Sequence, residues 1–202
     1  MALTLYHAPP SGNSLKIRFL LAELGLEHGL APVPMGRPRP DWYLALNPTG
    51  GVPTLVDGDL VLSESNTILR YLALREGRDD LYPDAVRDRV RVDRLLDTWS
   101  TLVRPSIFQL ESACGLFGET DEAAAAAVLP DVQAVLGMVE QLVDGNGTMT
   151  GSFTIADVCA APTLFRTSKL ELPLDWSQLP RLAAVRDTAT ARPAFAAADP
   201  VR

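Results

Sequence analysis

Hydrophobic residues are spaced in two different ways along this chain, and the change falls near residue 80. Before that point, short runs of branched and aromatic residues predict strands over 3–6, 31–33, 54–56 and 60–62. Apolar residues three and four positions apart predict helices over 14–24 and 65–75. Strands and helices are therefore mixed in the first part of the chain.

After residue 84 no strand pattern remains. Helical spacing covers about 84–112, 120–143, 154 onward and 178–191. Thr154 followed by Asp157 three residues later predicts a capping box at the third of these helices. The sequence predicts an α/β N-terminal domain of the thioredoxin type over 1–76, a linker over 77–84 and an all-α helical domain over 85–202.

Pro53 stands at the entry of the predicted hairpin, where a proline removes a donor from the strand ladder. The strand-forming residues around it favour a cis Val52–Pro53 bond, which turns the N–H and C=O of Val52 sideways. An extended peptide can pair with those two groups. The run Ser63, Glu64 and Ser65 follows at the start of the next helix. Together the two segments predict a site that holds a small peptide.

The chain has 202 residues, a net charge of −7 and a pI near 4.8. Nucleic acid is excluded as a partner, because phosphate binding needs basic stripes. No stretch approaches the ~18 apolar residues of a membrane span, and residues 1–5 lack the pattern of a signal peptide. Cys114 and Cys159 form no CxxC motif and have no histidine nearby, which argues against a metal site and fits a reducing cytoplasm.

Four segments of the chain resemble cytosolic glutathione S-transferases. They are Asn-Pro-Thr-Gly-Gly-Val-Pro-Thr-Leu at 47–55, Leu-Ser-Glu-Ser-Asn-Thr-Ile-Leu-Arg-Tyr-Leu at 62–72, Phe-Thr-Ile-Ala-Asp at 153–157, and the first strand and loop at 5–14. The resemblance covers essentially the whole chain. It implies glutathione as co-substrate, no metal, and a homodimer in which the small domain of one subunit pairs with the helical domain of the other.

The resemblance assigns most of the glutathione contacts to two segments. The residues that match Glu64 and Ser65 hold the γ-glutamyl end, and the residue that matches Val52, beside Pro53, binds the backbone of the cysteinyl unit. Physical chemistry agrees with this assignment. A hydroxyl and the N–H groups of a helix start favour a carboxylate, while a glutamate can pair with an ammonium group.

Gly51 departs from the family pattern, in which a lysine or glutamine helps to bind the glycyl carboxylate. Arg37 or Arg39, in the proline-rich segment before Asp41, is the expected substitute. Without such a substitute, this chain would bind glutathione weakly.

The resemblance also implies that glutathione reacts as a thiolate. Lowering a thiol pKa from about 8.5 to about 7 needs roughly 2 kcal/mol of preferential interaction with the anion. One hydrogen bond to a charged acceptor supplies about 1.5–3 kcal/mol, so one hydroxyl is sufficient. Ser11 matches the catalytic serine of many members and ranks first as donor. Asn13 resembles the amide donor of bacterial and fungal members and ranks second, and Ser14 is interpreted as a helix cap.

The second substrate is implied to be a small hydrophobic electrophile, bound between the domains against the long helix after the linker. Candidate pocket walls, by position alone, are Trp99, Leu102, Arg104 and Phe108. The leading prediction is thus a cytoplasmic glutathione transferase that conjugates such compounds, as in detoxification.

Two alternatives stay open. The amide of Asn13 and the absence of a cysteine from the first loop also suit a glutathione-dependent disulfide reductase. Gly51 suits a non-catalytic binding or regulatory module that kept the fold and lost turnover.

Overall fold

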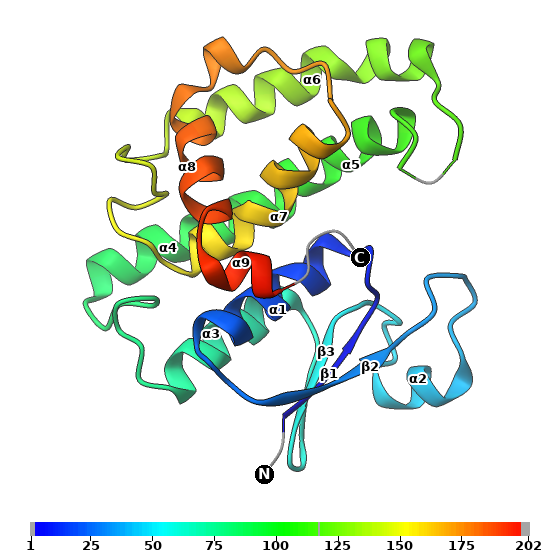
Figure 1. Cartoon of the computed structure of the whole chain (residues 1–202), viewed down its shortest axis with the longest axis vertical. Helices are drawn as coiled ribbons and strands as arrows, with labels where there is room; N and C mark the ends of the chain where they lie inside the picture. The colour runs from blue at the N-terminus through cyan, green and yellow to red at the C-terminus, as the bar shows by residue number, and fades with distance from the viewer. Residues whose placement is uncertain (1–2, 117, 199–202) are drawn as a thin grey trace. The chain divides into compact units, whose positions relative to one another are not determined.

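The computed structural model describes residues 3–116 and 118–198 and divides into two compact units (Figure 1). The first unit contains the chain up to Tyr82 together with the segment that begins at Arg192, and the second runs from Pro83 to Ala191. The first is an α/β unit of the thioredoxin type and the second is helical, so the predicted fold class is confirmed.

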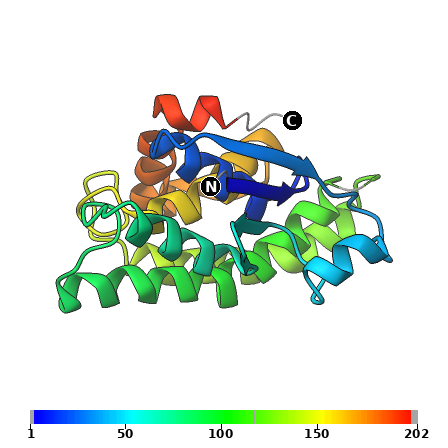
Figure 2. The ribbon, with the colours of Figure 1, turned by 90° about the horizontal axis from the view of Figure 1, so that it is seen from below.

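A four-stranded mixed sheet in the order β2-β1-β3-β4 forms the centre of the first unit. Its strands are β1 (Leu3–His7), β2 (His28–Pro32), β3 (Thr54–Asp57) and β4 (Leu60–Leu62). The strands β1 and β2 run parallel and lie side by side in Figure 2, while β3 pairs antiparallel with both β1 and β4. Parallel neighbours need a crossover connection, and here α1 (Gly12–Glu23) supplies it.

The core of the first unit lies where helices cover this sheet. Leu5 and Leu55 face each other across β1 and β3, and both are buried. On the helices α1 and α3 (Ser65–Arg75), which pack against each other, the buried side chains repeat at helical spacing and include Ile17, Leu20, Ile68 and Leu72. A further helix, α2 (Asp41–Leu46), lies in the segment that leads to the hairpin.

The C-terminal helix α9 (Pro193–Ala197) packs against α1 and belongs to the first unit. Its Phe195 meets Phe19 of α1 edge to face, with ring centroids 5.2 Å apart. The guanidinium of Arg192 pairs with Glu23 at the end of α1. The boundary expected from the sequence assigned this segment to the helical domain, and the structure differs. One phenylalanine in a five-residue helix does not reveal from its spacing which core will bury it.

Every named element in the described part of the second unit is a helix or a helical turn, and one loop adds an isolated β-bridge between Gly145 and Thr148. The helices and turns are α4 (Val86–Thr98), the π-helical turn η1 (Trp99–Val103), α5 (Arg104–Ala113), α6 (Glu122–Glu140), α7 (Ile155–Lys169), the 3-10 turn η2 (Trp176–Gln178) and α8 (Pro180–Thr190). The predicted helix over 84–112 is thus interrupted at η1. Pro105 lies just after this turn and has no N–H to donate to the carbonyl of Thr101, which favours a local change of helix type.

Helix α6 is long and apolar enough to cross a membrane by length and composition, and only 22% of that stretch is buried. The expectation that no stretch of this kind exists is therefore wrong for α6, whose alanines raise the average hydropathy. Length and composition are weak evidence for a membrane span, and α6 packs against α5 and α8.

The predicted capping box at the start of α7 is confirmed. The carboxylate of Asp157 accepts hydrogen bonds from the backbone N–H of Thr154 and from that of Met149, both at 2.8 Å. Asp157 is fully buried, and burial raises its pKa to about 6 although these hydrogen bonds act in the opposite direction.

Candidate functional site

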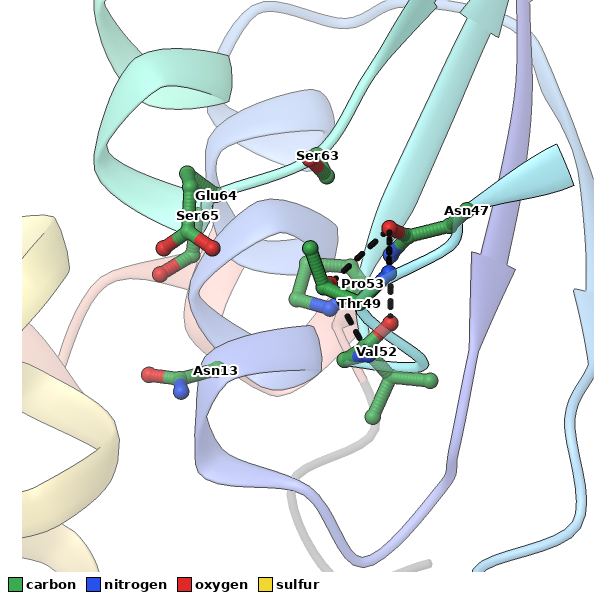
Figure 3. Close-up of a pocket in the computed structure, with 9 residues that line it drawn as sticks. Asn13, Asn47, Thr49, Val52, Pro53, Ser63, Glu64 and Ser65 are labelled. Atoms are coloured by element: carbon green, nitrogen blue, oxygen red, sulfur yellow. Dashed lines mark hydrogen bonds between the residues drawn. The ribbon is translucent and has the colours of Figure 1, made fainter. Parts of the chain in front are cut away.

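A pocket of about 120 Å³ opens in the first unit (Figure 3). Three segments supply its walls: the first turn of α1, the loop before β3, and the turn from β4 into α3. The lining residues are Asn13, Asn47, Thr49, Gly51, Val52, Pro53, Ser63, Glu64 and Ser65. The structure thus brings together five predicted site residues, Asn13, Val52, Pro53, Glu64 and Ser65.

The Val52–Pro53 bond is cis, and the loop that carries it is held from behind by Asn47. The amide of Asn47 donates to the carbonyl of Gly51 at 2.9 Å and to the hydroxyl of Thr54 at 3.1 Å, and its oxygen accepts from Thr49 (Figure 3). Within the described residues, the N–H and C=O of Val52 make no hydrogen bond. The loop therefore presents one donor and one acceptor to a ligand.

Asn47 is a site residue that the sequence patterns did not predict. The signal was present, because an asparagine directly before a proline is a common loop device whose side chain bonds nearby backbone. Its burial beneath the loop could not be derived from the sequence.

Glu64 and Ser65 form the opposite wall. Glu64 has a φ of 66°, in the left-handed region that disfavours side chains, and sits at the N-cap of α3 without a side-chain capping bond. Ser65 is the first residue of α3, so its N–H has no acceptor within the helix. In the described part of the chain, neither side chain makes a hydrogen bond. A carboxylate, a hydroxyl and a helix start with open N–H groups thus meet at one edge of the pocket.

The first loop holds Ser11 and Asn13 at the start of α1. Ser11 is the N-cap, and its Oγ accepts from the N–H of Ser14 at 3.3 Å, whereas Asn13 lines the pocket. The prediction that Ser14 caps the helix is wrong. Ser14 is buried, and its Oγ instead accepts from the N–H of Ala8 at 3.2 Å, which ties the loop to the end of β1.

Arg37 and Arg39 have different surroundings. The guanidinium of Arg39 is buried and donates to the carbonyls of Gly50 at 2.9 Å, Gly36 at 3.4 Å and Pro34. These bonds occupy Arg39 within the loop, so it does not serve as the expected substitute. Arg37 is exposed and has no polar partner among the described residues, and its Nη1 lies 3.9 Å from where a Cβ on Gly50 would stand.

The four residues predicted to line the acceptor pocket also differ in their surroundings. Trp99 is 1% exposed, and its Nε1 donates to Thr163 at 3.4 Å, so it belongs to the core of the second unit rather than to a pocket wall. Its position on the helix could not reveal this, because burial depends on α7 packing behind it. Leu102 and Phe108 are 47% and 41% exposed, and the guanidinium of Arg104 lies over the Phe108 ring.

No group of three or more histidine, cysteine, aspartate or glutamate side chains that could hold a metal occurs in the ranges 3–116 and 118–198. Both cysteines are free thiols, Cys159 buried and Cys114 half-buried.

A thioredoxin-type unit followed by an all-helical unit is the architecture of the glutathione transferase class. The chain matches the family models described as Glutathione S-transferase, N-terminal domain, over residues 10–75 and Glutathione S-transferase, C-terminal domain, over residues 122–188. It is 33% identical over 205 residues to glutathione S-transferase 3 of Zea mays, which covers 96% of this chain and 91% of that protein.

Two further relatives cover nearly the whole chain. Maleylacetoacetate isomerase of Pseudomonas aeruginosa is 33% identical over 210 residues, covering 98% of this chain and 96% of that protein. The structure of the theta class glutathione S-transferase from the citrus canker pathogen Xanthomonas axonopodis pv. citri, with glutathione bound, matches with a TM-score of 0.84. Its sequence identity is 31%, over 96% of this chain and 95% of that one.

The chain belongs to the cytosolic glutathione S-transferase family. It is a transferase with glutathione as co-substrate, and neither the disulfide reductase nor the non-catalytic alternative is favoured.

Proposed function

We propose that the pocket in the first unit holds glutathione and that the loop before α1 activates its thiol for conjugation to a hydrophobic electrophile. The proposal rests on two sets of groups that line one pocket and make no hydrogen bonds among the described residues. One set is the N–H and C=O of Val52, and the other is the side chains of Glu64 and Ser65 on the opposite wall. Extended peptide backbone fits the first group, and an amino acid end with an ammonium and a carboxylate fits the second. The γ-glutamyl-cysteinyl part of glutathione carries both.

Ser11 is the proposed main donor to the thiolate, with Asn13 beside it. A serine hydroxyl has one donor hydrogen and two acceptor sites. The Oγ of Ser11 therefore keeps its hydrogen for the sulfur while it accepts from the N–H of Ser14. Asn13 lies on the first turn of α1 and lines the pocket, where its amide N–H groups are a second source of stabilisation.

Arg37 is the proposed partner of the glycyl carboxylate, in place of the lysine or glutamine that Gly51 does not supply. Its exposed, unpaired guanidinium beside Gly50 lies next to the loop that carries Val52. The planar fork of an arginine suits a carboxylate.

The proposed electrophile is largely apolar, and Leu102 and Phe108 are exposed apolar side chains of the helical unit. We further propose a homodimer that works in the cytoplasm, in the removal of reactive compounds. Two free thiols support a reducing compartment, and the exposed Leu74 and Val90 are large apolar side chains that an interface would cover. Light scattering in solution tests the dimer.

Calorimetry with glutathione and a conjugation assay with chlorodinitrobenzene test the function. We expect binding at millimolar glutathione or below, and a rate that falls about 10- to 100-fold in Ser11→Ala, because a hydrogen bond to a charged group is lost. Asn13→Ala is expected to lose less. Absence of binding at millimolar glutathione would exclude the proposed site, and unchanged rates in both variants would exclude the proposed donors.

A further inference from the structure

Two buried side chains bond the same carbonyl in the loop that carries Val52. The hydroxyl of Tyr43 donates to the carbonyl oxygen of Gly51, and the amide of Asn47 donates to it at 2.9 Å (Figure 3 shows the bond from Asn47). Both side chains belong to buried residues. A carbonyl oxygen has two lone pairs, so the acceptor capacity of this oxygen is filled by the two donors.

A third buried group, the hydroxyl of Thr54, fixes which atoms donate in this network. It lies 2.9 Å from the Oη of Tyr43 and accepts from the amide of Asn47 at 3.1 Å. A carbonyl cannot donate, so the single hydrogen of Tyr43 goes to Gly51 and the hydroxyl of Thr54 donates to Tyr43. Hydrogen bonds joined in such a chain strengthen one another. Tyr43 therefore transmits the bond from Thr54 to the loop.

Both donors to the carbonyl of Gly51 come from one short helix. Tyr43 lies in α2, and Asn47 is the C-cap of that helix, with its N–H bonded to the carbonyl of Tyr43 at 2.8 Å. The helix therefore holds the two donors at a fixed separation. A carbonyl bonded from two fixed points cannot turn without breaking one of the bonds.

The carbonyl of Gly51 and the N–H of Val52 belong to one peptide group. The bond between these residues is trans, since the cis bonds of the described residues lie elsewhere, so its C=O and N–H point in opposite directions. Fixing the carbonyl therefore fixes the direction of the N–H as well. That N–H makes no hydrogen bond within the described residues, and Val52 lines the pocket. Tyr43 and Thr54 thus act on a pocket that they do not line themselves.

We propose that Tyr43 is a positioning residue for glutathione, which acts through the carbonyl of Gly51 to direct the N–H of Val52 at the carbonyl of the cysteinyl unit. The inference rests on the proposed function and assigns a role to a side chain behind the site. Hydrogen bonds weaken steeply as their angle closes, so the direction of this N–H decides how much the contact contributes. The contacts of the γ-glutamyl end do not depend on it.

The test variant is Tyr43→Phe, which removes one hydroxyl and keeps the buried ring. The matched control is Tyr71→Phe, which removes a hydroxyl that donates to Asp57 at 2.6 Å, outside the pocket. Calorimetry compares three ligands. Glutathione and γ-glutamylcysteine carry an acceptor oxygen on the carboxyl carbon of the cysteinyl unit, and γ-glutamylcysteamine lacks that group.

In Tyr43→Phe we expect the affinity for glutathione and for γ-glutamylcysteine to fall about threefold to tenfold, the range that one hydrogen bond spans. The affinity for γ-glutamylcysteamine should change less than about twofold, because the contact in question is absent from it. In the conjugation assay, KM for glutathione should rise and kcat should stay nearly constant, since Ser11 lies outside the network. Tyr71→Phe should change none of these values appreciably.

An equal loss for all three ligands in Tyr43→Phe would show that the hydroxyl only stabilises the loop, and would overturn the inference. A loss for none of them would do the same, and both results leave the proposed function intact. Wild-type protein that binds no glutathione at millimolar concentration would overturn the proposed function and the inference with it. If Tyr43→Phe does not fold, as judged by circular dichroism, Thr54→Val takes its place. It removes the hydroxyl that donates to Tyr43, and we expect the same selective loss.

Discussion

Glu64 combines a backbone conformation that disfavours side chains with a carboxylate that has no partner in the described residues. Strain of this kind costs on the order of 1–3 kcal/mol and persists where it serves a site. Glu64→Gly should therefore stabilise the protein by about 1 kcal/mol, after the entropy cost of glycine, while glutathione affinity falls about tenfold or more. Urea unfolding and calorimetry measure the two effects.

Glu64→Ala is the matched control for this substitution. It removes the carboxylate but keeps a Cβ, and so keeps the strain. We expect the same loss of affinity without the gain in stability. A glycine variant that is no more stable than the alanine variant would show that the backbone of Glu64 is not strained.

The two arginines of the proline-rich segment should respond differently to the same change. Arg39→Gln removes buried donors from the carbonyls of Gly50 and Gly36 and should cost about 1–3 kcal/mol of stability. Arg37→Gln should leave stability unchanged and weaken glutathione binding severalfold. The dipeptide γ-glutamylcysteine, which lacks the glycyl carboxylate, is the diagnostic ligand. Its affinity should be equal in wild type and Arg37→Gln, and an equal loss for both ligands would contradict the assignment of Arg37.

At the residue scale, the sequence predicts best what local chemistry determines. Four predicted residues reach one pocket because each lies just before, or at the start of, a strand or helix whose position the hydrophobic spacing predicts. They are Val52 and Pro53 before β3, and Glu64 and Ser65 at the start of α3. The errors concern burial. Nothing local shows that Arg39 is enclosed by its own loop, or that Trp99 and Ser14 face a core.

At the scale of elements, the capping box of α7 makes stability depend on pH. The pKa of Asp157 is raised by burial to about 6, above its ordinary value, so the folded state holds this proton more tightly than the unfolded state. The protonated Asp157 therefore contributes its full stabilisation at pH values below the pKa of the unfolded state. This stabilisation is lost as the pH rises through about 6. Asp157→Asn cannot ionise and should lack this slope.

Urea unfolding of wild type and Asp157→Asn between pH 4 and pH 7 measures the effect. We expect the variant to be less stable by about 1–3 kcal/mol at pH 4, because an amide cannot accept from both Met149 and Thr154 as the carboxyl group does. The difference should shrink by about 1 kcal/mol or more by pH 7. A difference that grows with pH would mean that the hydrogen bonds outweigh burial at Asp157.

The helices also show why some elements were predicted with the right bounds and others were not. The helix over 65–75 is marked by the apolar spacing of Ile68, Leu69 and Leu72, and the helix after Thr154 by its capping box, so both appear as predicted. The long helix predicted over 84–112 has an unbroken apolar pattern, but the structure interrupts it with the π-helical turn η1, which ends just before Pro105. The short helix α2 has too few turns for a period to be recognised.

At the scale of the whole molecule, the chain returns at its C-terminal end to the unit in which it began. Phe195 of α9 is 2% exposed and packs on Phe19, which is fully buried, so the last helix completes the core behind α1. Phe195→Ala should destabilise the first unit by about 3 kcal/mol or more, because a buried ring leaves a cavity. Ala197→Ser, on the exposed side of α9, should leave stability unchanged.

Hydrogen exchange shows which helices lose stability in Phe195→Ala. The amides of α1 should exchange markedly faster in the variant, since their helix loses its cover, whereas those of α7 should keep their protection because α7 lies in the other unit. Faster exchange confined to α7, or equal acceleration in both helices, would contradict the assignment of α9 to the first unit. Since α1 also carries Asn13 and is capped by Ser11, the same variant should weaken glutathione binding. A short C-terminal helix would then help to position the catalytic loop at the other end of the sequence.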